Sequence, residues 1–237
     1  LVGAVIGLID DYFEVKGKKD HLAGGLSLKK RLLVVFVVSL IGAWWFYSKL
    51  EMTSVAIPLV GDLDIGLLFI PFFIIVMLGI YSGGVIDGID GLAGGVFSSA
   101  FSAYGVIAFV QNQVDLATFS FVIVGGLLAF LWFNIPPARF YMSETGSMAL
   151  TMTLAVVAFL TKEVLVLPII AFPLVITTLS DIIQILSKKL RGKKIFLVAP
   201  IHHHFEAKGW PGYKVTMRYW VISVVFAFVG VIIALLK

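Results

Sequence analysis

The chain has 237 residues, of which 60% are hydrophobic and 14% charged, with a mean hydropathy of +1.05 and a formal net charge of +4 at pH 7. These values exclude a water-soluble globular domain of this length. The charged residues are clustered, and the apolar stretches between them have the roughly 17 to 25 residues that a helix needs to cross a bilayer. Cysteine is absent, which excludes disulfides and thiolate metal sites.

The predicted fold is an all-α, polytopic membrane bundle that forms a single domain, residues 1–237. The first apolar stretch stops at Asp10 after only nine residues, and we interpret it as the truncated span of a fragment that has lost its N-terminal membrane spans. Seven full spans are predicted after it, none with a buried charge at its centre: residues 32–50, 65–82, 92–110, 116–135, 147–161, 164–187 and 216–236.

The topology follows from lysine and arginine, which are concentrated in the connections 10–31 and 188–218. The positive-inside rule assigns both to the cytoplasm, whereas 51–64, 111–115 and 162–163 have no basic excess and are expected outside. Alternation then brings four polar groups to the cytoplasmic face: Asp10 with Asp11, Asp87 with Asp90, Arg139 with Glu144, and His202 to His204. The remaining histidine, His21, is expected to be a solvated residue of the first basic loop.

Two of these groups are pairs of acids. Asp10 and Asp11 follow an apolar helix directly, where carboxylates oppose the helix dipole, so a divalent cation or a proton-transfer task competes with a solvated helix end. Asp87 and Asp90 lie three residues apart among glycines, which permit close approach of a ligand or of a neighbouring helix. Tight helix packing with the acids as caps is the structural alternative.

The other two groups lie in connections. Glu144 follows a proline-terminated span and begins the next helix, where backbone N–H groups favour phosphate; ordinary loop and cap chemistry is the alternative. Arg139 supplies a cation fork suited to phosphate or carboxylate. Three adjacent histidines without cysteine make a poor zinc site, so a phosphate-binding role is preferred for His202 to His204.

The segments IDDY, DGIDGLAGG, FNIPPARFYMSETGSMAL and APIHHHFEAKGW occur in this order, and the chain thereby resembles the phospho-N-acetylmuramoyl-pentapeptide transferase family. The resemblance implies ten helices in the bacterial plasma membrane with both termini outside, so that about two N-terminal spans are missing here. It also implies an active site on the cytoplasmic face. It implies transfer of phospho-N-acetylmuramoyl-pentapeptide from UDP to undecaprenyl phosphate, giving lipid I and UMP in peptidoglycan synthesis, with Mg²⁺. The implied partners are UDP-MurNAc-pentapeptide, undecaprenyl phosphate and the lipid bilayer, with no nucleic acid; a homodimer is left open.

The resemblance also implies roles for individual residues. Glu144 matches the magnesium-ligand position and is assigned to catalysis with Asp10 and Asp11, of which Asp10 is the candidate base or phosphate-orienting group. The implied substrate-binding residues are Asp87, Asp90, Asn134, Tyr141, His202, His203, His204 and Arg31.

Three positions depart from the family pattern. Glu144 replaces an aspartate within what is usually Gly-Asp-Thr-Gly-Ser, Arg31 replaces a lysine, and residues 81–86 lack two asparagines. Two other functions are therefore weighed. A polyprenyl-phosphate GlcNAc-1-phosphate transferase would differ in its donor sugar, and a membrane transporter or lipid-binding protein would be no enzyme.

Overall fold

The structure is a computed structural model that describes residues 1–16 and 26–236. His21 and most of the first basic loop lie outside the described residues. The helices are α1 Val2–Lys16, α2 Leu28–Lys49, α3 Phe69–Ser82, α4 Leu92–Val110, α5 Val114–Asn134, α6 Ser143–Leu160, α7 Leu167–Ile170, α8 Phe172–Arg191, α9 Ile201–Ala207 and α10 Gly212–Leu235. Short 3₁₀ helices cover Gly66–Leu68, Gly83–Ile86 and Val164–Val166, and the strands are β1 Ser54–Ile57 and β2 Gly61–Asp64.

The predicted all-α membrane fold is confirmed. Among the described residues, six helical segments are long and apolar enough to cross a membrane, and a seventh span results if one bent pair is counted as a unit. The six correspond to the predicted spans that begin near residues 32, 65, 92, 116, 147 and 216. The small antiparallel pair β1–β2, which aligns Ser54 with Asp64 and Ile57 with Gly61, lies within the connection 51–64.

The predicted span 164–187 is not one continuous helix. Its two parts, Val164–Ile170 and Phe172–Arg191, meet at an angle of 80°. Pro173 lies in the first turn of α8, and proline has no N–H to continue the preceding helix. Asp181 lies in the middle of α8 but is only partly buried, so the expectation that no span has a buried charge at its centre is not contradicted there.

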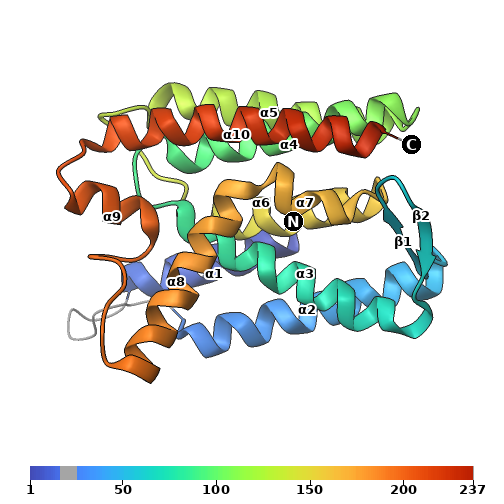
Figure 1. Ribbon diagram of the computed structural model, residues 1–237, viewed down its shortest axis with the longest axis horizontal. Coiled ribbons are helices and arrows are strands. Elements are labelled where there is room, and N and C mark those ends of the chain that lie inside the picture. The colour runs from blue at the N-terminus through green and yellow to red at the C-terminus, as the bar shows by residue number, and fades with distance from the viewer. Residues whose placement is uncertain (17–25, 237) are drawn as a thin grey trace.

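The arrangement of the helices separates two ends of the bundle (Figure 1). The β-hairpin and the C-terminus lie at one end, whereas α9 and the start of α4 lie at the other. Helix α4 packs against both α5 and α10, and α6 packs against α1 and α3. The end that holds α9 therefore collects the connections that the sequence placed together on one face.

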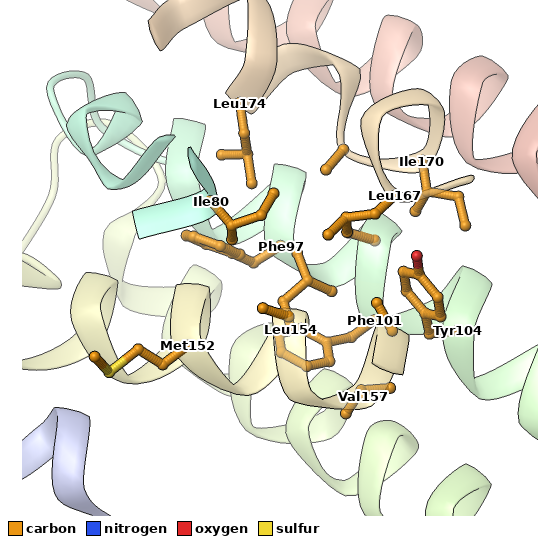
Figure 2. Packing of buried hydrophobic residues seen from close by; sticks show 14 of the residues in the cluster. Ile80, Phe97, Phe101, Tyr104, Met152, Leu154, Val157, Leu167, Ile170 and Leu174 are labelled. Carbon is orange, nitrogen blue, oxygen red and sulfur yellow. The ribbon is translucent and has the colours of Figure 1, made fainter. Parts of the chain in front are cut away.

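The core consists of large apolar side chains from facing helices (Figure 2). Phe73 of α3 stacks on Phe159 of α6 with ring centroids 4.4 Å apart, and Phe46 of α2 lies 5.0 Å from Phe73. Lipid tails are as apolar as these rings, so the hydrophobic effect does not drive the helices together within the bilayer. Close packing of the side chains holds them together instead. Tyr104 and Leu154 extend the same buried cluster in Figure 2.

Part of the glycine-rich segment after Asp87 serves helix packing. A Cβ at Gly95 would collide with the indole of Trp220 in α10, and one at Gly94 would come within 2.7 Å of Leu131 in α5. The Trp220 indole N–H also donates to the Gly91 carbonyl at 3.0 Å. The packing alternative considered for these glycines therefore holds for Gly94 and Gly95.

Candidate functional site: a carboxylate network beside a histidine helix

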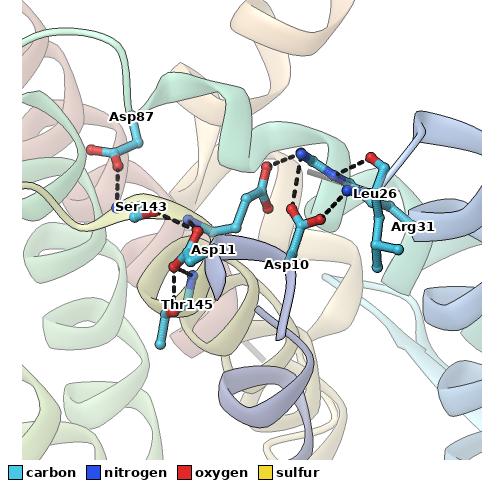
Figure 3. A network of polar contacts seen from close by, with 8 residues as sticks. Asp10, Asp11, Leu26, Arg31, Asp87, Ser143 and Thr145 are labelled. Atoms are coloured by element: carbon cyan, nitrogen blue, oxygen red, sulfur yellow. Dashed lines mark hydrogen bonds and ion pairs between the residues drawn. The ribbon is translucent and has the colours of Figure 1, made fainter. Parts of the chain in front are cut away.

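Three segments distant in sequence meet at one end of the bundle. The C-terminal half of α1 carries Asp10 and Asp11, the link before α4 carries Asp87, and the first turn of α6 carries Glu144. Figure 3 shows Asp10, Asp11 and Asp87 along one chain of polar contacts that also includes Arg31. Helix α1 approaches α6 closely because residue 7 is glycine: a Cβ there would come within 2.6 Å of the Thr145 Cα.

Asp11 caps the N-terminus of α6 from the neighbouring helix. One of its oxygens accepts from the Ser143 hydroxyl at 2.6 Å and the Glu144 N–H at 3.2 Å. The other accepts from the Thr145 N–H at 3.0 Å and from the Thr145 hydroxyl. The first N–H groups of a helix have no partner within the helix, and a carboxylate there also meets the positive end of its dipole.

The expected phosphate site at the start of α6 is consequently not free. Asp11 already uses the N–H groups of Glu144 and Thr145. The alternative of cap chemistry holds for this helix end, with the cap supplied by α1. Asp11 thus fixes the backbone that carries Glu144, and the catalytic role expected for Asp11 itself stays a prediction.

Arg31 connects Asp10 and Glu144. Its NH1 donates to Glu144 Oε1 at 2.5 Å, and its NH2 lies 2.8 Å from Asp10 Oδ2. Its Nε–H donates to the carbonyl of Leu26 at 3.0 Å, and the Leu26 N–H donates to Asp10 Oδ1. Asp10 is completely buried, and a buried carboxylate is stable only when a cation and hydrogen bonds accompany it.

Asp87 and Asp90 both hold the connection between α5 and α6. Asp87 Oδ2 accepts from the Ser143 N–H at 2.9 Å, and Asp90 Oδ2 accepts from the Ala138 N–H at 3.1 Å. Burial raises the pKa of Asp87 to about 6, although the bond from Ser143 opposes this and the charge of Asp11 adds to it. The two acids therefore order the loop that leads to Glu144, and their contacts with a nucleotide stay predictions.

Asn134 and Tyr141 differ in their accessibility. Asn134 is buried; its Oδ1 accepts from the Gly91 N–H at 2.9 Å and its Nδ2 donates to the Phe140 carbonyl at 2.9 Å. Its amide thus connects the α4 start with the α5–α6 connection. Tyr141 is 69% exposed, which leaves its ring open for stacking. The side chain of Arg139 is also exposed and is therefore accessible to a ligand.

The three histidines lie on α9 in three different environments. His202 is completely buried, and neither of its ring nitrogens has a hydrogen-bond partner among the described residues. His203 Nδ1 lies 2.6 Å from Glu206, and His204 Nδ1 accepts from the Leu197 N–H at 3.0 Å. Burial, with a smaller contribution from His203, lowers the pKa of His202 to about 3.

Gly88 brings this helix to the aspartate segment. A Cβ at Gly88 would come within 2.7 Å of Nε2 of both His202 and His203. The segment with Asp87 and Asp90 is therefore in contact with helix α9 at Gly88. The structure brings together the acidic and histidine segments that the sequence assigned to one face.

The structure adds a polar face of α8 that the sequence analysis missed. Ser180, Gln184 and Ser187 are buried and hold the connection 192–201 by hydrogen bonds to its backbone. Their spacing of four and three residues was a detectable signal of one helix face. Asp181 on the same helix lies near enough to His203 to interact with its charge.

The resemblance implies a Mg²⁺ site, for which the carboxylates are the candidate ligands. Within the described ranges, no cluster of three or more histidine, cysteine or acidic side chains could hold a metal ion. Asp10 and Glu144 nevertheless converge on one guanidinium, and magnesium is commonly held by one or two carboxylates with substrate phosphates and waters. The two residues fit such an ion, provided that Arg31 leaves the position between them.

Comparison with known proteins gives the class to which this membrane protein belongs. The sequence model of the family described as "Glycosyl transferase family 4" matches residues 1–162. The chain is thus a polytopic membrane protein of a glycosyl transferase family, with its acidic and histidine segments gathered at one end.

Individual relatives narrow this class. The phospho-N-acetylmuramoyl-pentapeptide-transferase of Anoxybacillus flavithermus is 38% identical over 231 residues, covering 97% of this chain and 70% of the relative. The enzyme of the same name from Shouchella clausii is 39% identical over 235 residues, with 97% and 70% covered, and that of Clostridium perfringens 39% over 227 residues, with 95% and 70% covered. The chain belongs to the phospho-N-acetylmuramoyl-pentapeptide-transferase family.

Proposed function

We propose that this protein transfers phospho-N-acetylmuramoyl-pentapeptide from its UDP carrier to undecaprenyl phosphate, yielding lipid I and UMP. The observation that carries the proposal is the convergence of Asp10, Asp11, Asp87 and Glu144 with Arg31 at one end of a membrane bundle. A reaction between a lipid phosphate and a nucleotide diphosphate needs such a polar site at the membrane surface. The relatives named above carry the name of this activity.

In the reaction, an oxygen of the lipid phosphate attacks the phosphorus that bears the sugar. A new P–O bond forms, the bond from that phosphorus to the UMP oxygen breaks, and UMP leaves with the electron pair. A phosphate monoester has its second pKa near 6 and is largely dianionic at neutral pH, so the attack requires no protein base. The burial of Asp10 and its pairing with Arg31 support an orienting role for Asp10 rather than that of a base.

The remaining parts of the site have assigned tasks in this proposal. Magnesium, when bound at Glu144, neutralises phosphate charge and aligns the reacting groups. Asp11 fixes the first turn of α6 and thereby Glu144, while Asp87 and Asp90 order the connection that carries the exposed Tyr141. Tyr141 stacks on the uracil, and the partly exposed His203 and His204 of α9 contact the phosphate and sugar-peptide part of the donor. His202, which is completely buried, makes no such contact in this arrangement.

The proposal includes the cellular setting. The protein resides in the bacterial plasma membrane with this end of the bundle facing the cytoplasm, which the lysine-rich and arginine-rich connections 10–31 and 188–218 support. The β-hairpin and the C-terminus, at the opposite end in Figure 1, then face outside. A homodimer stays a prediction that the mass of the protein in detergent would check.

The test measures UMP release by the purified protein with undecaprenyl phosphate and either UDP-MurNAc-pentapeptide or UDP-GlcNAc. UMP release is expected with UDP-MurNAc-pentapeptide and not with UDP-GlcNAc. Release with UDP-GlcNAc and not with the muramoyl donor would establish the rival transferase. Release with neither donor would favour a non-enzymatic role. Glu144→Gln removes a charge with little change of shape and should lower turnover on the order of 100-fold. The matched control is Glu14→Gln, an exposed acid of α1; full activity of Glu144→Gln would place the metal elsewhere.

A further inference from the structure

Arg31 is held from three sides at the point where a metal ion would bind. Nε–H is fixed by the Leu26 carbonyl, NH1 by Glu144 and NH2 by Asp10. The side chain of Arg31 is 20% exposed, that of Glu144 27% and that of Asp10 0%. The guanidinium is therefore a built part of the site and not a mobile surface cation.

Arg31 occupies the position from which one ion could contact Glu144 Oε1 and Asp10 Oδ2 together. Magnesium binds carboxylate oxygen at about 2.0–2.1 Å, whereas Glu144 Oε1 already receives an N–H from only 2.5 Å away. Asp10 Oδ2 is buried and lies 2.8 Å from NH2, yet it has no partner with hydrogen-bond geometry. The guanidinium thus balances the charge of Asp10 but leaves one of its oxygens without a directed bond.

The presence of arginine rather than lysine at position 31 makes it harder for an ion to bind between Asp10 and Glu144. Arginine stays protonated in proteins and presents a planar fork that reaches two carboxylates at once. Lysine, by contrast, is a compact charge without that fork. A lysine here could pair closely with one acid and leave the other for an incoming ion, whereas Arg31 contacts both.

We propose that Arg31 is an internal counter-cation that closes the site between Asp10 and Glu144 and must withdraw before a divalent ion binds. The withdrawn guanidinium is then available to the phosphate groups that arrive with the ion, for which its fork is suited. Metal affinity in the absence of substrate is accordingly low, and substrate phosphates raise it by providing Arg31 with a new partner. The inference rests on the proposed function in taking Glu144 as the position of the metal.

The experiment measures Mn²⁺ binding by the full purified chain in detergent, from the loss of the EPR signal of free Mn²⁺, without nucleotide or lipid phosphate. Arg31→Gln is expected to bind Mn²⁺ at least about tenfold more tightly than the wild type, which corresponds to about 1.4 kcal/mol. Arg31→Lys should lie between the two. Lys30→Gln, which removes the same charge from an exposed neighbour, should change the Kd by less than about threefold, the size expected for a screened surface charge.

The double variant Asp10→Asn with Arg31→Gln should lose most of the gain, because Asp10 is one of the two acids that Arg31 pairs with. An Arg31→Gln affinity equal to or below that of the wild type, or an equal gain in Lys30→Gln, would overturn the proposal. If Arg31→Gln does not fold, Arg31→Lys decides, because its Kd must fall below the wild-type value. Failure of the proposed function would instead appear as an absence of UMP release by the wild type and would leave the Mn²⁺ titration readable.

Discussion

Asp11→Ala is the substitution that separates a structural from a purely catalytic role of the acidic pair. It removes the acceptor of four bonds, from the N–H groups of Glu144 and Thr145 and from the hydroxyls of Ser143 and Thr145. Loss of a helix cap costs about 0.5–2 kcal/mol, and hydrogen bonds to a charged group contribute about 1.5–3 kcal/mol each. Because bonds to one carboxylate are not additive, we expect the free energy of unfolding to fall by about 2–4 kcal/mol.

The assay is thermal unfolding of the purified protein in detergent, followed by tryptophan fluorescence. For a chain of this size, a loss of about 2–4 kcal/mol corresponds to a midpoint lower by roughly 4–16 °C. Amide hydrogen exchange should also become faster in the first turn of α6, where the freed N–H groups lie. Asp11→Asn, which keeps one acceptor oxygen, should lose less than Asp11→Ala.

The control is Glu14→Ala, which removes an exposed acid from the same helix and should leave the midpoint nearly unchanged. If Asp11→Ala and Glu14→Ala unfold at the same temperature, the cap does not stabilise the contact between α1 and α6. Loss of turnover without loss of stability would assign Asp11 to the chemistry alone.

Two further predictions concern the backbone and the histidine helix. Ser143 has a φ of 59°, a left-handed conformation that costs a side chain about 1–2 kcal/mol, so Ser143→Gly should unfold at a higher temperature than Ser143→Ala; the reverse order would show that this turn is unstrained. Since the pKa of His202 is lowered to about 3, its neutral form stabilises the fold above pH 6.5, and this contribution is lost as the pH falls from 6.5 towards 3, by up to about 1.4 kcal/mol per pH unit. His202→Gln should therefore flatten the acid side of a plot of unfolding midpoint against pH, whereas a slope equal to that of the His204→Gln control would contradict burial of a neutral imidazole.

Several features of the fold could be predicted because they depend on composition alone. A helix that crosses a bilayer must satisfy its own backbone and be apolar along its length, so hydropathy located the spans. The bend between α7 and α8 was missed, although Pro173 offered a local signal. The role of Gln184 was also missed, because its amide binds backbone groups eleven and twelve residues later in the chain.

The sequence alone determined the class of membrane protein and the family-like motifs, because both are written in residue type and spacing. The alternation of charges also grouped Asp10, Asp87 and Glu144 at one face before any contact was known. Only the tertiary structure decided what each carboxylate does, since their partners come from other helices. Asp11 caps α6, whereas Asp10 and Glu144 share Arg31. Two adjacent aspartates thus acquire different tasks because successive side chains of α1 point to different neighbours.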